Sequence, residues 1–304
     1  MISALRKQGL SQAQIARQLE RSPSTVSREL RRNACNDGHY RPSKADSRTR
    51  GRRSRSRRNQ QFSDADYQIV THYLKRDWSP EQVSGHLRQH DKLRISHETI
   101  YRFVWRDKAT GGELYRHLRG SRKQRRKRYN AYDSRGRLAG KRHISERPAE
   151  VERRETLGHW EIDTVMGRGS KDCIVSLVER KTGYLLIGKL KNRTKETLNE
   201  RAIGLIDAHA PDFKTITADN GTEFHGYRDI EAQTGVTFYF ATPHHSWERG
   251  TNENTNGLIR QYLPKGTSMA DLTQEECNAI ARKLNARPRK RLGYRSPEEC
   301  YDGF

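Results

Sequence analysis

The hydrophobic positions at the start of the chain recur with the spacing of short amphipathic helices. Ile15 and Leu19 lie one helical turn apart, and the same spacing returns at Val26 and Leu30 after a polar break. Ser11 precedes the first pair as an N-cap residue. This pattern predicts a helix-turn-helix unit with helices at 1–8, 11–19 and 23–30.

A second group of helical segments follows between residues 62 and 120. Ser79 and Pro80 supply an N-cap and a first helical position, and Ile100 and Val104 belong to the apolar stripe of a later helix. Because this segment is less basic than the first, an all-helical protein-docking module is the alternative to a second helix-turn-helix unit. The expected helices are 67–75, 80–90 and 95–105.

Beyond residue 150 the period of the pattern changes. Apolar and polar residues alternate in short runs bounded by turn residues, and helical spacing returns between the later runs. The order β-β-β-α-β-α-β-α is that of a ribonuclease-H-like domain. We therefore predict a multidomain protein in which all-α helix-turn-helix units precede an α/β ribonuclease-H-like catalytic domain. The expected strands are 157–165, 172–179, 184–190, 213–218 and 236–241, and the expected helices are 194–209, 226–235 and 248–263.

The formal net charge of +23 is concentrated in the first half of the chain. Residues 1–150 carry 37 Lys and Arg against 15 Asp and Glu, whereas residues 151–304 carry 23 against 22. A basic field of this size favours association with nucleic acid, and double-stranded DNA is the expected partner. The predicted domains are helix-turn-helix units at 1–40 and 62–120, basic linkers at 41–61 and 121–150, and the α/β domain at 151–304.

The second helix of a helix-turn-helix unit enters the major groove, with its first residues at the base edges. Basic residues farther along that helix position the protein on phosphates. A helical hairpin with a solvated, charged face is the alternative. The candidate residues are Ser24, Thr25, Ser27 and Arg28 for base edges, Arg31 and Arg32 for phosphates, and Thr99 and Arg102 in the second unit.

Other features restrict the cellular setting. No apolar run approaches the ~18 residues of a membrane span, so no membrane partner is expected. The four cysteines are scattered without a CxxC pair, which favours reduced thiols in the cytoplasm. His86 and His90 share a helical face, but without a cysteine pair the spacing does not favour zinc.

Three acidic residues are the candidate chemical centre. Asp163 and Asp219 each end a strand-like run, and Glu253 lies near the start of a predicted helix, with 33 residues between it and Asp219. Gathered carboxylates raise each other's pKa. A pair of divalent ions about 4 Å apart removes that cost and supports phosphoryl transfer. Arg260, seven residues after Glu253, shares its helical face. The expected phosphate contacts in this half are Arg260, Lys265 and the tail 287–291, which includes Arg289.

With these motifs, the chain resembles the IS-thirty family of bacterial insertion-sequence transposases, within the DDE transposase and integrase superfamily. The resemblance covers nearly the whole length, and the spacing of the acidic residues and of the following basic residue agrees with the family pattern. The segments that carry it are RSPSTVSRELRRN, ISHETIYRFV, HWEIDTVMG, TADNGTEF, SWERGTNENTNGLIRQYLPKGT and NARPRKRLGYRSPEE.

The resemblance implies a mechanism. Asp163, Asp219 and Glu253 would bind two Mg²⁺ ions, for which Mn²⁺ substitutes, and the helix-turn-helix units would hold the terminal inverted repeats of the element. Water would free a 3′-OH at each element end, and that hydroxyl would attack another strand without a covalent protein intermediate. Two ends cut in concert imply a homo-oligomer, at least a dimer. A repressor that kept only the fold and a nuclease that does not join strands are the rival functions.

Overall fold

The computed structural model describes residues 1–35, 37–55, 61–119, 140–169, 171–209, 212–243 and 245–303. The chain divides into two compact units, residues 1–67 and residues 68–304. Among the described residues, no helix has both the length and the apolar character needed to cross a membrane.

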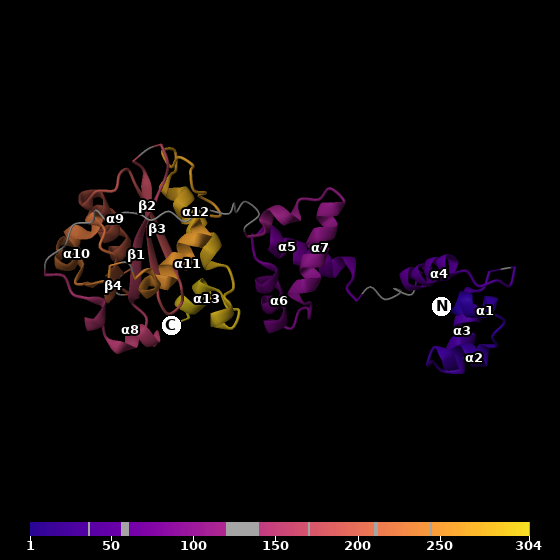
Figure 1. The fold of residues 1–304 in the computed structure, drawn as a ribbon. Helices are drawn as coiled ribbons and strands as arrows, with labels where there is room; N and C mark the ends of the chain where they lie inside the picture. Colours follow the sequence, from indigo (N-terminus) through magenta and orange to yellow (C-terminus); the bar gives the residue numbers. More distant parts are fainter. Residues whose placement is uncertain are drawn as a thin grey trace. The chain divides into compact units, whose positions relative to one another are not determined.

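The first unit begins with the helices that the apolar spacing predicts. Ser11 and Gln14 form a capping box at the start of the second helix. Ile15 and Val26 are buried between the helices, and Leu30 lies with them. The elements are α1 (Ile2–Lys7), α2 (Gln12–Gln18), α3 (Pro23–Asn33) and α4 (Pro42–Arg55), all labelled in Figure 1.

Helix α4 shows that the prediction of an unpacked basic linker at 41–61 is wrong for most of that segment. Ala45 is 4% exposed, although the segment is rich in Arg and Ser. Arg52 donates to the Arg32 carbonyl oxygen at 3.1 Å and to Asn33 Oδ1 at 2.6 Å. A guanidinium there satisfies carbonyl groups at the end of α3 and complements its dipole. Part of the basic charge therefore serves packing within this unit.

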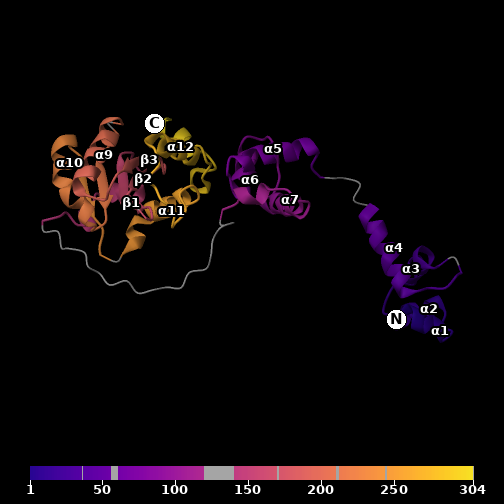
Figure 2. The ribbon, with the colours of Figure 1, turned by 90° about the horizontal axis from the view of Figure 1, so that it is seen from above.

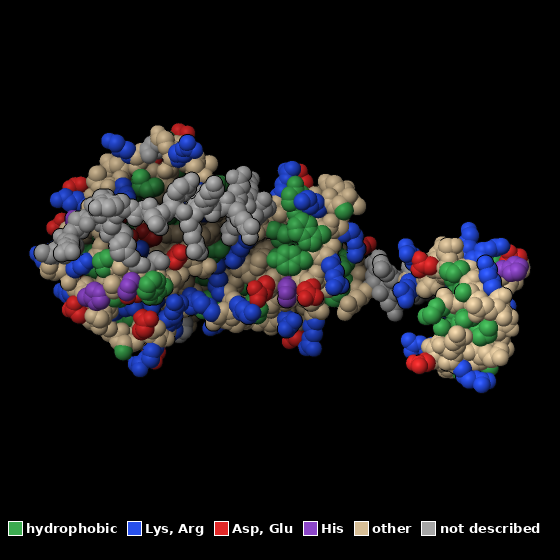
Figure 3. Space-filling view, viewed as in Figure 1, with side chains coloured by type: hydrophobic (Ala, Val, Ile, Leu, Met, Phe, Trp, Pro, Cys, Tyr) green, Lys and Arg blue, Asp and Glu red, His purple; other side chains and the backbone are tan. Residues whose placement is uncertain are grey.

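A second group of helices, which we call the α5–α7 module, follows. Ser79 and Gln82 form the capping box of α6, and Ser96 caps α7. Figure 3 shows hydrophobic side chains gathered on the visible face of this module. Tyr101 and Trp105 of α7 are among the exposed large hydrophobic residues of the chain. The protein-docking alternative for this module therefore remains open. Its helices are α5 (Asp64–Lys75), α6 (Pro80–Gln89), α7 (His97–Ala109) and the 3₁₀ turn η1 (Leu114–His117).

The α/β domain contains one five-stranded mixed sheet in the order β3-β2-β1-β4-β5. The first three strands form an antiparallel meander, whereas β4 and β5 run parallel to β1. The predicted order of strands and helices is confirmed. The strands are β1 (His159–Met166), β2 (Cys173–Glu179), β3 (Leu185–Leu190), β4 (Thr215–Ala218) and β5 (Thr237–Phe240), and the helices are α8 (Ala149–Arg153), α9 (Lys195–Asp207), α10 (Tyr227–Thr234), α11 (Gly250–Ile259), α12 (Gln274–Asn285) and α13 (Pro297–Tyr301), with short 3₁₀ turns η2 (Ile144–Glu146), η3 (Thr222–Gly226), η4 (Ser246–Arg249) and η5 (Lys290–Leu292).

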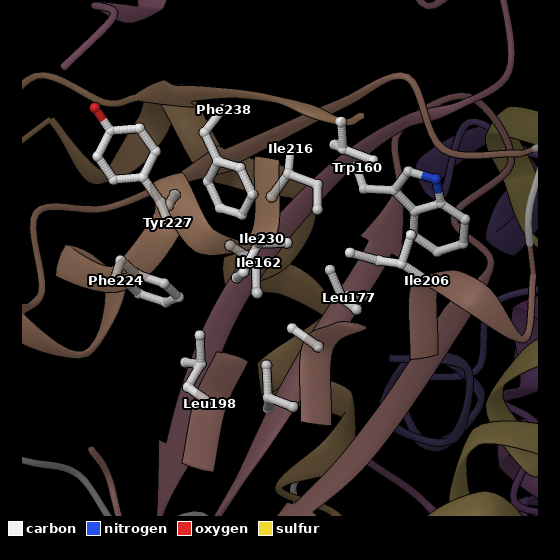
Figure 4. Close-up of a cluster of buried hydrophobic side chains, with 14 of the residues drawn as sticks. Trp160, Ile162, Leu177, Leu198, Ile206, Ile216, Phe224, Tyr227, Ile230 and Phe238 are labelled. Carbon is white, nitrogen blue, oxygen red and sulfur yellow. The ribbon is translucent and has the colours of Figure 1, made fainter. Parts of the chain in front are cut away.

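Helices cover both faces of this sheet, as Figure 2 shows with α9 and α10 on one side and α11 and α12 on the other. Trp160 and Ile162 of β1 point into the first core, together with Phe224 and Phe238 (Figure 4). Val165 lies in the second core, against α11 and α12. Because side chains alternate along a strand, the odd-numbered residues of β1 face α11.

The predicted basic linker at 121–150 is wrong at its carboxyl-terminal end. The Phe240 amide donates to the Arg142 carbonyl oxygen at 2.9 Å, and His143 forms an isolated parallel bridge with Phe240. Residues 140–150 are therefore packed against the edge strand of the α/β domain. The remainder of this linker, residues 121–139, and residues 56–60 of the first linker lie outside the described residues.

Candidate active site

Strand register places the two aspartates side by side. Strands β1 and β4 are parallel neighbours, with Glu161 opposite Thr217. Asp163 lies two residues after Glu161, and Asp219 lies two residues after Thr217. Both aspartates are therefore on the same face, since side chains alternate with a period of two. Adjacent strands lie about 4.8 Å apart. The pairing of a central strand with its parallel neighbour therefore brings together two carboxylates that are 56 positions apart in sequence.

Each aspartate uses one oxygen for its own backbone turn. Asp163 Oδ1 accepts from the Thr164 amide at 2.8 Å, and Asp219 Oδ1 accepts from the Gly221 amide at 2.8 Å. The other oxygen of each residue, Oδ2, is directed to a shared space. Asn256 of α11 donates to Asp163 Oδ2 at 2.9 Å.

The guanidinium of Arg249 lies in that shared space. Its Nη2 is 3.2 Å from Asp219 Oδ2, and its Nη1 is 3.8 Å from Asp163 Oδ2. Nη1 also donates to the carbonyl oxygen of Ile162 at 3.0 Å. The Arg249 side chain is 12% exposed, and each aspartate side chain is 24% exposed. The sequence analysis assigned no role to Arg249, although the residue lies in the conspicuous WERG segment.

Burial makes the Asp163 carboxylate costly to ionise. It raises the pKa of Asp163 to about 6, while Arg249 acts in the opposite direction and Asp219 adds to the rise. A low-dielectric setting disfavours the charged form, and a neighbouring carboxylate has the same effect. An additional cation at this position would restore the ionised form.

Glu253, on helix α11, borders the same space. Asp163, Arg249, Glu253 and Asn256 line a cavity of about 240 Å³. Glu253 is exposed, whereas the residues around it on α11 hold the helix to the sheet. Glu253 therefore stands on a fixed helix with a free carboxylate end, one turn after Arg249.

Buried polar groups fix the start of α11. Glu161, on the same face of β1 as Asp163, accepts from the Asn252 amide at 2.8 Å and pairs with the buried Arg180. Ser176 of β2 donates to Asn256 Oδ1 at 3.0 Å. These contacts set the height of the helix over the sheet, and so the position of Glu253. No local sequence signal marks Glu161, Arg180 or Ser176 as supports of this helix.

Glu223, an acidic residue of the TADNGTEF segment, is buried at 1% exposure in η3. It accepts from Thr164 Oγ1 at 2.9 Å and from Arg193 Nε at 2.7 Å. Both hydrogen bonds are accepted by Oε1, whereas the buried Oε2 has no hydrogen-bond partner in the part of the chain that the structure describes. Within the described residues, no three His, Cys, Asp or Glu side chains stand in a geometry that could hold a metal ion as drawn. Arg249, not a third acid, closes the gap between Asp163 and Asp219.

The predicted base-edge residues lie on one exposed surface of α3. Arg28 Nε donates to the Ser24 carbonyl oxygen at 3.1 Å, which folds the side chain along the helix. In the second module, Arg102 is exposed and Thr99 is half-buried next to the cap of α7. The exposed residues of this set on α3 are Ser24, Thr25, Ser27, Arg28, Arg31 and Arg32.

The predicted phosphate contacts of the catalytic half divide into one exposed residue and two arginines that donate to backbone carbonyl oxygens. Lys265 is exposed. Arg260 donates to the Met166 carbonyl oxygen at 2.9 Å, and Arg289 donates to the Leu284 carbonyl oxygen at 3.0 Å. Burial lowers the pKa of Arg289 to about 9.

The prediction that the tail 287–291 as a whole contacts phosphate is wrong at Arg287. That side chain is fully buried and donates to Gln261 Oε1 at 3.0 Å. A guanidinium without exposed surface cannot meet a DNA backbone. Arg287 is a structural residue.

Comparison with known proteins supports the same class of protein. A family model described as "Helix-turn-helix domain" matches residues 1–33. The chain is 39% identical to the transposase for insertion sequence element IS4351 of Bacteroides fragilis, over 99% of this chain and 92% of the relative. It is 40% identical to the transposase for IS1086 of Cupriavidus metallidurans, over 93% and 86%. It is 37% identical to the transposase InsI for IS30A of Escherichia coli K12, over 95% and 78%.

A helix-turn-helix region followed by a ribonuclease-H-like sheet with clustered carboxylates defines a DNA-binding enzyme of the transposase class. The extent of the matches makes the assignment specific. The chain belongs to the IS30 family of insertion sequence transposases, and its function is DNA transposition.

Proposed function

We propose that Asp163, Asp219 and Glu253 are the catalytic carboxylates and that they hold two Mg²⁺ ions. The observation that carries this proposal is the arrangement of the two aspartates, whose Oδ1 atoms are held by backbone amides while both Oδ2 atoms face one space. Glu253 borders the same cavity. Carboxylate oxygens are the ligands that Mg²⁺ prefers, so the donor set suits this ion and also Mn²⁺.

The reaction is hydrolysis followed by transesterification. The oxygen of water forms a bond to phosphorus at the element end, the bond to the 3′ oxygen breaks, and a 3′-OH and a 5′-phosphate result. That 3′-OH then attacks a phosphodiester of another strand, which forms the new junction and releases a target 3′-OH. Bound divalent ions supply charge neutralisation and activation of the attacking oxygen, as DDE-class transposases typically require. Asp163, Asp219 and Glu253 would hold these ions, and α11 holds Glu253 in place.

DNA recognition is assigned to the exposed face of α3. Ser24, Thr25, Ser27 and Arg28 lie where the second helix of such a motif meets base edges. We propose that they select the terminal inverted repeats, and that Lys265 contacts phosphate near the cut. Since two element ends are joined, the active complex contains at least two copies of the chain, in the bacterial cytoplasm.

Three single substitutions test the carboxylate assignment. Asp163→Asn, Asp219→Asn and Glu253→Gln should each lower Mg²⁺-dependent end cleavage and strand transfer by at least about 10³-fold, because each removes a ligand charge from the site. Binding to a labelled duplex of the element end should be retained. Gel assays with uncut and pre-cut ends measure the two steps separately.

Asp271→Asn, which changes an exposed acid at a loop of the same domain, is the matched control and should leave both steps unchanged. If any of the three variants cleaves at the wild-type rate, that residue has no catalytic role. A wild-type protein that shortens the ends but never joins them would instead indicate a nuclease.

A further inference from the structure

Arg249 occupies the position that the proposed catalytic ions need. Its guanidinium contacts Asp219 Oδ2 and lies near Asp163 Oδ2, the two aspartate oxygens that the backbone leaves available. At 12% exposure it is the cation that offsets the paired carboxylates in the free protein. The two aspartates carry a formal charge of −2, so one guanidinium leaves the pair at −1.

A divalent ion that bridges the two Oδ2 atoms competes with this guanidinium for the same space. Mg²⁺ binds its ligand oxygens at about 2.0–2.1 Å in a nearly octahedral shell. The Arg249 guanidinium, with nitrogens 3.2 Å and 3.8 Å from the two Oδ2 atoms, fills the space in which an ion that bridges both oxygens would bind, and the two cations repel each other at such a distance. Metal binding therefore requires the Arg249 side chain to leave.

The local structure allows that movement without refolding. Arg249 ends η4 and is the N-cap residue of α11, where its side chain makes no cap hydrogen bond. The helix itself is held by other residues, since Glu161 binds the Asn252 amide and Ser176 binds Asn256. Rotation of the Arg249 side chain costs its contact with the Ile162 carbonyl and with the two carboxylates, and it leaves Glu253 where it is.

A DNA phosphate is a chemically suitable partner for the released guanidinium. A planar guanidinium binds phosphate oxygens in a bidentate manner, and the DNA that enters the active site brings a phosphodiester to the edge of the same cavity. DNA therefore stabilises the state in which Arg249 is outside, which is also the state that binds metal.

We propose that Arg249 is an internal competitor for the catalytic metal site, displaced by the ions and taken up by the DNA backbone, so that metal and DNA each strengthen the binding of the other. This inference rests on the proposed carboxylate site. It explains why no three acidic side chains of the described residues form a metal-binding group, although Asp163 and Asp219 both contact the space that Arg249 fills. Coupling of this kind is reciprocal.

Metal binding without DNA is the direct test. Mn²⁺ is titrated into the full chain, and free Mn²⁺ is followed by electron paramagnetic resonance. Arg249→Gln should bind Mn²⁺ about tenfold more tightly than the wild type, since the competing cation is gone. Arg249→Met, which keeps the apolar stem of the side chain, should show the same gain. Arg249→Lys keeps a positive charge by the aspartates and should remain close to the wild type.

Arg142→Gln removes an arginine that pairs with Glu231 elsewhere in the domain, and it should leave Mn²⁺ binding unchanged. A second measurement follows DNA affinity by fluorescence anisotropy with and without Ca²⁺. Ca²⁺ should strengthen DNA binding by the wild type and have less effect on Arg249→Gln. Equal or weaker Mn²⁺ binding by both neutral variants overturns the inference and leaves the proposed function standing. Undiminished Mn²⁺ binding by Asp163→Asn and Asp219→Asn would instead overturn the proposed function, and with it this inference.

Discussion

A single carboxylate, Glu248, organises the loop that leads into α11. Its Oε2 accepts from the Thr242 amide at 2.8 Å, and its Oε1 accepts from Thr242 Oγ1 at 3.0 Å and lies 3.3 Å from His245 Nδ1. Burial alone would raise the pKa of Glu248, but the hydrogen bonds from Thr242 and His245 outweigh it and hold the pKa below the ordinary value of 4.5. The charged form is therefore bound more tightly in the folded protein.

This arrangement predicts a pH-dependent contribution of Glu248 to stability. A group whose pKa is lowered by folding stabilises the protein above its unfolded pKa and loses that effect as pH falls through the folded pKa. Glu248→Gln should cost about 1 kcal/mol at pH 7. The difference from the wild type should shrink below about pH 4.5. Urea unfolding at both pH values measures it, with the exposed Glu200→Gln as control. A difference that grows on acidification would contradict this account.

At the scale of the element, α11 depends on charges buried beneath it. Glu161 is fully buried, pairs with Arg180 and accepts the Asn252 amide. Arg180 has a second acidic neighbour, Glu152, at 3.4 Å, whose side chain is 72% exposed. Two glutamates therefore pair with the same arginine, one of them buried and the other exposed. Substituting each in turn compares the effect of burial.

Glu161→Ala should destabilise the domain by about 3–5 kcal/mol, because it leaves a buried guanidinium without its partner. Cleavage should fall as well, since the start of α11 loses its link to β1. Glu152→Ala removes an exposed partner of Arg180 and of the buried Arg147, which keeps its hydrogen bond to Thr217 Oγ1, and it should cost less than Glu161→Ala. Urea unfolding and end cleavage are measured on both variants. Equal losses from the two substitutions would show that Glu161 does not hold the helix.

The elements were predictable where apolar periodicity carries the information, and less so where polar groups do. Strand alternation predicted β1, but Glu161 resembles an ordinary solvent-facing residue until α11 is seen to cover that face of the sheet. The α4 segment has no apolar stripe that would predict a packed helix. Its contact with α3 is made instead by a polar side chain, Arg52, which donates to a carbonyl oxygen at the end of α3. The position of Arg249 depends on strand pairing across the sheet, which no local pattern reveals.

At the scale of the whole second unit, the carboxyl-terminal segment contacts the α5–α7 module. Asp77, in the turn between α5 and α6, accepts from Tyr262 Oη at 3.1 Å and lies 3.9 Å from Arg287 Nη2. Gln82 of α6 donates to the Pro288 carbonyl oxygen at 2.8 Å. Residues that composition alone assigns to a DNA-binding tail therefore join a helical module to the catalytic domain.

Arg287→Met should loosen this contact. The substitution removes the hydrogen bonds of a buried guanidinium to Gln261 and Tyr262, at a cost of about 2–3 kcal/mol. Lys290→Met breaks only the pair with Glu81, whose side chains are 74% and 51% exposed, and should change little. Hydrogen exchange should accelerate in α6 and around Pro288 in the first variant alone. Unchanged exchange in Arg287→Met would assign the joint to other contacts.

The closest fit in this joint involves a residue without a side chain. A Cβ atom on Gly85 of α6 would lie 2.1 Å from Cδ1 of Tyr294, whose backbone adopts a left-handed conformation with φ of 66°. The aromatic ring rests directly on the helix backbone, so the two positions are tied to each other. A hybrid enzyme that takes its two halves from related elements would therefore clash at this joint if it combined a larger residue at position 85 with tyrosine at position 294.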